Sequence, residues 1–75
     1  MESPERGELT DDSPLSRDDL DVLAALSRGK SLQGVADELH LSHRSVSRQV
    51  NGICERLGVE RTIQAVVWAV RRELI

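Results

Sequence analysis

Residues 31–58 read SLQGVADELHLSHRSVSRQVNGICERLG. Ser31 and Ser42 each stand where a helix N-cap is expected, directly before a run whose apolar residues recur at helical spacing. In the second run these residues fall at i, i+4, i+7 and i+11, on one helix face, and Gly58 closes the run. They are Val46, Val50, Ile53 and Leu57. The pattern predicts two helices joined by a connection of about three residues, which is a helix-turn-helix.

The outward face of the longer helix carries basic and amide side chains. Arg48 and Asn51 are three residues apart and are therefore neighbours on the helix surface. Arg44 lies one turn before Arg48, and Ser47 lies at its side. Arginine can form two hydrogen bonds to one guanine, and asparagine can form two to one adenine, so these residues suit the major groove of double-stranded DNA. We expect residues 42–57 to be a recognition helix, although periodicity alone is equally compatible with an ordinary solvated helix face.

Two further helices flank this pair. Ser16 as N-cap and Asp19 three residues later form a capping-box pattern, which predicts a helix over about residues 17–28 that Gly29 ends. The last helix is predicted over about residues 62–73. It has one apolar row, Ile63, Val66, Val67, Val70 and Leu74, and a second apolar side with Ala65, Trp68 and Ala69. The predicted fold is all-α, a four-helix bundle with a helix-turn-helix and no wing.

Charge is divided unevenly along the 75 residues, which hold 10 Lys+Arg against 13 Asp+Glu for a net charge of −3. Residues 1–16 hold five carboxylates and one arginine, a balance of −4, whereas residues 17–75 hold nine basic and eight acidic residues, a balance of +1. We therefore expect residues 1–14 to be a disordered acidic arm or linker and residues 15–75 to be the folded domain.

Composition excludes several classes of protein. A chain of this size cannot easily combine a substrate cavity with a packed core, and no nucleophile, base and orienting group can be assembled from it, so we predict no enzyme and no cofactor. Cys54, His40 and His43 lack the number and spacing of zinc ligands, so no metal is expected. The longest uncharged stretch, Thr62–Val70, is too short to cross a membrane, and a cytoplasmic location is predicted.

An ordered set of short motifs resembles the LuxR/GerE-type DNA-binding domain. The motifs are Leu15-Ser16-Arg17, Val22-Leu23, Gly29-Lys30-Ser31, Val35-Ala36, Leu41-Ser42, Ser45-Val46, Ile53, Arg56-Leu57-Gly58-Val59 and Gln64-Ala65-Val66. The Ala-Val-Val-Trp run at residues 65–68 is similar to the effector domain of NarL-type response regulators. The resemblance implies a transcription regulator whose third helix enters the major groove and whose fourth helix commonly forms a two-fold dimer on paired half-sites.

Carried onto this chain, the resemblance implies three groups of site residues. Base contacts fall on Ser47, Arg48 and Asn51, and phosphate contacts on Lys30, Ser42, Arg44 and Arg56. Trp68 aligns on the last helix with other residues that we expect in a homodimer interface, while packing inside a single domain is its alternative role. The predicted interface residues are Ala65, Trp68, Ala69 and Arg72.

Several positions depart from the family pattern, among them Gln49 in place of the usual histidine and Arg61 one position before the usual arginine. Gly34 stands where the family usually has a glutamate that completes a capping box with Ser31, and this should weaken the second helix by about 1 kcal/mol. Ser47 replaces a usual lysine, which removes a cation from the expected groove contact.

Other functions stay open alongside the DNA-binding prediction. The acidic net charge favours a module that binds another transcription regulator. A sigma-factor-like DNA-binding region is a second alternative, because it shares the helix-turn-helix spacing. The usual receiver or ligand-binding domain is absent, which indicates either an isolated effector domain or a stand-alone regulator controlled by abundance or by a protein partner. In the second case, residues 1–12 are expected to compete with DNA phosphates for the basic face.

Overall fold

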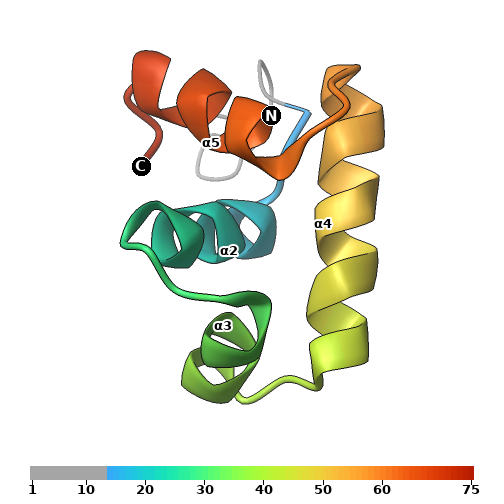
Figure 1. Cartoon of the computed structure of the whole chain (residues 1–75). Helices are drawn as coiled ribbons and strands as arrows, with labels where there is room; N and C mark the ends of the chain where they lie inside the picture. The colour runs from blue at the N-terminus through green and yellow to red at the C-terminus, as the bar shows by residue number, and fades with distance from the viewer. Residues whose placement is uncertain (1–13) are drawn as a thin grey trace, which may run out of the picture.

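The computed structural model describes residues 14–75, and the part described consists of four helices without any strand. They are α2 (Arg17–Ser27), α3 (Leu32–Leu39), α4 (His43–Leu57) and α5 (Thr62–Arg71). Helix α4 runs along one side of the molecule, and α5, α2 and α3 are stacked beside it (Figure 1). The all-α prediction with four helices and a helix-turn-helix is confirmed. All but one residue of the predicted acidic arm lies outside the described residues.

Serine caps begin the first three helices, as predicted. In each case the serine Oγ accepts a hydrogen bond from the backbone N–H three residues later, which satisfies one of the donors that a helix start leaves without a partner. The N–H groups belong to Asp19, Gly34 and Ser45, at 3.1, 3.1 and 3.0 Å from Ser16, Ser31 and Ser42. Helix α5 has no such serine; the Gln64 side-chain oxygen instead accepts from the N–H of Glu60 and of Arg61, at 3.0 and 2.7 Å.

The helix ends depend on residues in the left-handed region of the backbone. Gly58 has φ +71° and ends α4, and Gly29 has φ +90° beyond α2, where glycine adopts the conformation without strain. His40 ends α3 in the same left-handed conformation, with φ +61°. Helix α5 stops at Arg71, two residues before the predicted end, because Glu73 adopts φ +59°. The turn sends the N–H of Leu74 back to the Ala69 carbonyl at 2.9 Å and packs Leu74 against the core.

Helix α2 lies at the centre of the domain because it contributes to both apolar clusters of the core. The cluster shared with α4 and α5 contains Leu15, Leu20, Leu23, Ile53, Ala65, Val66 and Ala69. The cluster shared with α3 and α4 contains Val22, Ala25, Val35, Ala36, Val46 and Val50. Leu26 and Cys54 pack against both clusters and join them. Helix α4 is thus fixed along its length by two separate groups of contacts.

The side of α5 that faces the core includes two residues that were predicted to lie in the dimer interface. Ala65 and Ala69, which were predicted to contact a second copy, are completely buried in the domain's own core and have no exposed surface in the single domain. Trp68 is half-buried against the same core, and the Arg72 guanidinium lies 4.6 Å from the centre of its ring. Alanine lets the α2 and α5 backbones approach closely, which explains why this side of α5 is the one that packs.

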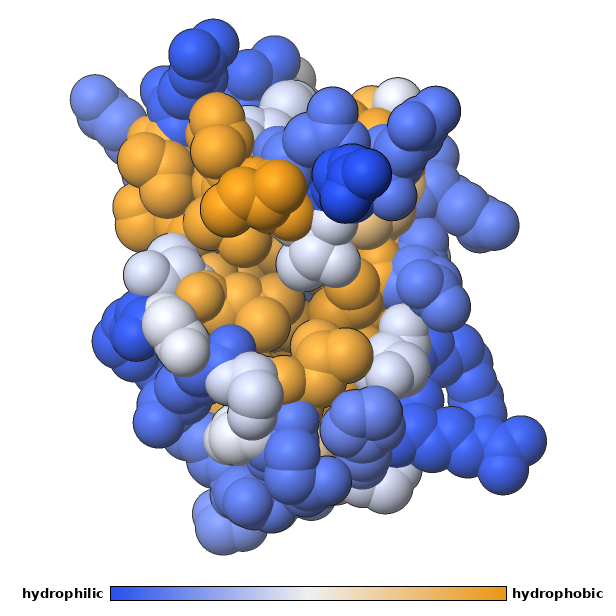
Figure 2. Space-filling model, in the orientation of Figure 1, coloured by the Kyte–Doolittle hydropathy of each residue, from blue (hydrophilic) through white to orange (hydrophobic). Residues whose placement is uncertain are grey.

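A different side of α5 is left exposed. Ile63, Val67 and Val70 fall at i, i+4 and i+7 on one stripe and are 62%, 42% and 50% exposed. Figure 2 shows apolar side chains gathered over α5 and continuing toward the middle of the same face of the molecule. The exposed apolar surface of α5 is therefore made of larger side chains than the two alanines that sequence reasoning placed there.

Candidate nucleic-acid interface

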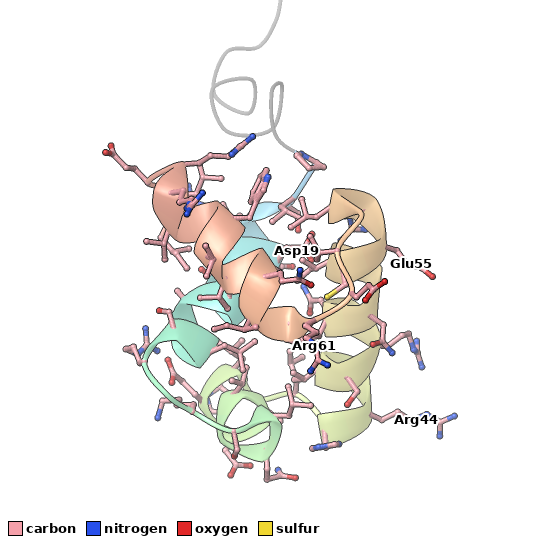
Figure 3. All side chains as sticks on the ribbon, turned by 45° about the horizontal axis from the view of Figure 1, so that its top comes forward. Asp19, Arg44, Glu55 and Arg61 are labelled. Atoms are coloured by element: carbon pink, nitrogen blue, oxygen red, sulfur yellow. The ribbon has the colours of Figure 1, made fainter. Side chains whose placement is uncertain are left out.

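Helix α4 presents two opposite faces. The buried face consists of Val46, Val50 and Ile53, with Leu57 partly covered at its end. Each residue advances about 100° around a helix, so Arg44 lies about 200° from Val46 and projects on the opposite side. Four exposed residues follow that opposite stripe at i, i+4, i+7 and i+11: Arg44, Arg48, Asn51 and Glu55. Arg44 and Glu55, near the two ends of the stripe, point away from the body of the domain (Figure 3).

The predicted base-contact residues lie together on this exposed side. Arg48 and Asn51 are exposed, and neither side chain forms a hydrogen bond or ion pair with any residue in the described range. Ser47 is half-buried on the flank of the stripe, one turn before Asn51. The hydrogen-bonding groups of Arg48 and Asn51 are therefore available to a ligand that covers α4.

Glu55 limits the extent of that surface. Its carboxylate continues the stripe beyond Asn51 and has no side-chain partner within residues 14–75. A carboxylate there repels phosphate, whereas Arg44 and Arg48 attract it. The first half of α4 is the part whose charge suits a nucleic acid, which agrees with a recognition helix that uses its N-terminal residues.

The residues predicted to contact phosphate differ in whether their side chains already have a partner in the described part of the chain. Arg44 has no side-chain partner in the described part of the chain. Lys30 lies 3.6 Å from a Glu38 oxygen, and Arg28 binds the other Glu38 oxygen at 2.6 Å. Lys30 is therefore partly neutralised at the protein surface, where such pairs are weak and exchangeable.

Ser42 is engaged through its hydroxyl group. Its Oγ accepts the N–H of Ser45 and donates to the Ser45 Oγ, both at 3.0 Å. The structure thus shows a helix-capping role for Ser42, and a DNA phosphate would have to replace the Ser45 Oγ as acceptor of the hydrogen bond that the Ser42 hydroxyl donates.

Arg56 forms an ion pair with Asp19 that sequence reasoning missed. Its Nη2 lies 2.7 Å from Asp19 Oδ2, and the Gln49 side-chain nitrogen donates to Asp19 Oδ1 at 2.9 Å. The predicted capping box is confirmed, because Ser16 N–H also reaches Asp19 Oδ2 at 3.0 Å. One signal could have revealed the longer-range contacts: Asp19 is one turn before Leu23 and therefore lies on the buried side of α2.

The remaining polar candidates have structural surroundings. Cys54 is half-buried between the two core clusters, and His40 caps α3. Within residues 14–75, no three His, Cys, Asp or Glu side chains are grouped so that they could hold a metal ion. In that same range, no helix has the length and apolar character that crossing a membrane requires.

Two consecutive helices joined by a short turn, with an exposed basic and amide face on the second, are the arrangement of helix-turn-helix DNA-binding domains. The family of bacterial regulatory proteins called luxR, or GerE, matches residues 13–69, which include α2, α3, α4 and most of α5. The chain belongs to this family, whose members are DNA-binding transcription regulators and not enzymes. A comparison with individual curated proteins gave no significant match.

Proposed function

We propose that the domain reads a specific sequence in duplex DNA by placing the first half of α4 in the major groove. The observation that carries this proposal is the exposed stripe of α4, where Arg44, Arg48 and Asn51 have no side-chain partners among the described residues. Side chains that are already paired would have to break those pairs before binding a base, whereas these three are available.

Base selection is assigned to Ser47, Arg48 and Asn51. A guanidinium can donate two hydrogen bonds to the guanine O6 and N7, and a carboxamide can pair with the adenine N6 and N7. Because Arg48 and Asn51 are adjacent on the helix surface, they can contact neighbouring base pairs. Ser47, on the flank, can donate to or accept from either kind of base.

Phosphate binding is assigned to residues at the edges of this surface. Arg44 lies at the exposed start of α4, Ser42 caps the same helix, and Lys30 precedes α3. Such contacts hold the protein in register on the duplex without selecting the sequence. Arg56 was predicted to belong to this group, but its guanidinium is already paired with Asp19.

We also propose that the domain works as a homodimer on DNA through α5. The support is the apolar stripe of Ile63, Val67 and Val70, whose large side chains are exposed in the single domain. Trp68 and Arg72 lie on the other flank of α5 and are already in contact with each other. The stripe therefore replaces Ala65 and Ala69 as the centre of the proposed interface.

Selection from a pool of randomised duplexes, followed by fluorescence anisotropy across a salt series, tests the DNA proposal. We expect enrichment of a motif with two half-sites and a fall of log K with log salt. Arg48→Ala should reduce the preference for the motif by about tenfold or more, which corresponds to a loss of about 1.4 kcal/mol or more. Arg71→Ala, at the end of α5 away from α4 (Figure 1), removes the same charge and should leave the preference unchanged.

Failure to enrich any motif would overturn sequence-specific binding. Weak binding that disappears near physiological salt would then make the interaction with another regulator the leading function. A motif without repeated half-sites would contradict the proposed dimer, and the proposal that a single domain reads bases would still stand.

A further inference from the structure

The geometry points to Asp19, Gln49 and Arg56 as a positioning set that fixes the orientation of α4 for base reading, with Arg56 acting through Asp19 and not as a phosphate ligand. The inference rests on the proposed function, since it concerns how α4 is held on DNA. It assigns a role in specificity to three residues outside the surface that contacts bases.

The Asp19 carboxylate is nearly enclosed, with its side chain 7% exposed, and it accepts hydrogen bonds on both oxygens. Oδ1 accepts from Gln49, whereas Oδ2 accepts from the Ser16 N–H and from Arg56. The donors come from the start of α2 and from two separate turns of α4. The shared carboxylate therefore connects the start of α2 to the side of α4.

The two contacts start from separate turns of α4 and converge on one carboxylate. Gln49 and Arg56 are seven residues apart, which is about 10 Å along the helix axis. Because both side chains meet at Asp19, a roll of α4 about its own axis would carry both donors away from the carboxylate together, so the two contacts oppose that roll.

Gly52 lies beside the guanidinium of Arg56. It lies between Gln49 and Arg56 on the same side of α4, and a Cβ added there would lie 3.9 and 4.0 Å from the two terminal nitrogens of Arg56. The Arg56 guanidinium therefore folds back over Gly52 toward Asp19. This direction brings two distant turns of α4 to one carboxylate.

Rotation of α4 would change base reading directly. Gln49 follows Arg48 in sequence, so the side held by Asp19 is about 100° from the side proposed to contact bases. With side chains extending about 5–6 Å from the helix axis, a roll of about 20° displaces their tips by about 2 Å. That displacement is large compared with the distance range over which a hydrogen bond to a base edge forms.

The charge of Arg56 is offset by its partner, which is why a phosphate role is disfavoured. A cation that neutralises a DNA phosphate releases a counterion and adds about 0.9 to the salt dependence of log K. Arg56 is 2.7 Å from a carboxylate before any DNA arrives, whereas Arg44 has no partner in the described range. Removing each of these arginines should therefore affect salt dependence differently.

The experiment compares binding of the full chain to the selected duplex and to a scrambled duplex, over a salt series. Asp19→Asn and Arg56→Gln should each lower the ratio of the two affinities by about tenfold, and Arg56→Gln should leave the salt slope unchanged. Arg44→Ala is the matched control and should reduce the slope by about 0.9 while keeping the ratio. Arg56→Lys, which keeps the cation beside Asp19, should recover part of the ratio.

Gln49→Ala keeps the ion pair and removes one of the two contacts on α4, so it provides a milder variant if Asp19→Asn does not fold. Circular dichroism identifies temperatures at which every variant is fully folded, and a residue that only stabilises the domain would not change the ratio there. A loss of about 0.9 in slope with an unchanged ratio for Arg56→Gln would overturn the inference and make Arg56 a phosphate ligand. If the wild-type chain shows no preference for any duplex, the proposed function itself fails.

Discussion

Helices α4 and α5 distribute their apolar residues in different ways. On α4 the apolar residues occupy one face and the opposite face is polar, so only one orientation buries the apolar side chains. On α5 apolar residues surround most of the helix, and the domain buries Ala65 and Ala69 while leaving Ile63 and Val70 exposed. An amphipathic helix thus specifies its own orientation. A helix that is apolar on several sides takes its orientation from its neighbours and retains an apolar face for another surface.

Two isoleucine substitutions test this contrast with the largest expected effect. Ile53 on α4 is completely buried, whereas Ile63 on α5 is 62% exposed. Ile53→Ala should lower the free energy of unfolding by about 3 kcal/mol, because it leaves a cavity between α2, α4 and α5. Ile63→Ala should change it by less than about 0.5 kcal/mol. Urea denaturation followed by circular dichroism measures both, and equal losses would mean that α5 packs by a different face.

Association of two copies tests the exposed stripe of α5 directly. Val67→Glu places a charge at the centre of the stripe, and we expect about tenfold weaker association on a duplex with two half-sites, since a buried unpaired carboxylate is costly. The stability of the single domain should change by less than about 0.5 kcal/mol. Glu73→Gln, beyond the end of α5, is a control for altered charge. Unchanged association, measured by sedimentation velocity with and without DNA, would assign the dimer to another surface.

Local signals account for the parts of the structure that the sequence predicted. A serine cap acts on an N–H three residues away, and Gly29 or Gly58 acts on the turn just before it, so the starts of the first three helices and the ends of α2 and α4 could be read from neighbouring residues. The face of α4 followed from its apolar period, and the available Arg48 and Asn51 followed from that face.

Longer-range choices could not be read from the sequence in the same way. Either apolar side of α5 could have faced inward, and the outcome depended on how closely α2 approaches the two alanines. The contact of Asp19 with Arg56 joins residues 37 positions apart, so no local pattern contains it. The family resemblance placed Arg56 among the phosphate contacts, and its partner on another helix was not visible in the sequence.

Helix α3 begins with the predicted serine cap and has a glycine in its first turn. Ser31 caps it, yet Gly34 occupies its first turn, where a Cβ would meet Lys30 and Ser31 atoms at ordinary contact distances of 3.5 Å. Gly34→Ala should therefore raise the free energy of unfolding by about 0.5–1 kcal/mol. Gly58→Ala is the matched opposite case, because φ at Gly58 is +71°, and it should destabilise the domain by about 1 kcal/mol. Thermal melts that shift in the same direction for both variants would contradict this view of the two glycines.

The smallest expected effect concerns the acidic residues that precede the described domain. Five carboxylates lie within residues 1–12: Glu2, Glu5, Glu8, Asp11 and Asp12. Because they are tethered close to the domain and have a high effective concentration, we expect them to compete with phosphates for the cationic side of α4. Deleting residues 1–12 should therefore tighten DNA binding by a few-fold at low salt and by less at physiological salt, where screening weakens the competition. A chain in which the five carboxylates are changed to amides should match the deletion. Affinity that is unchanged in both forms at low salt would show that these residues do not reach the DNA-binding face.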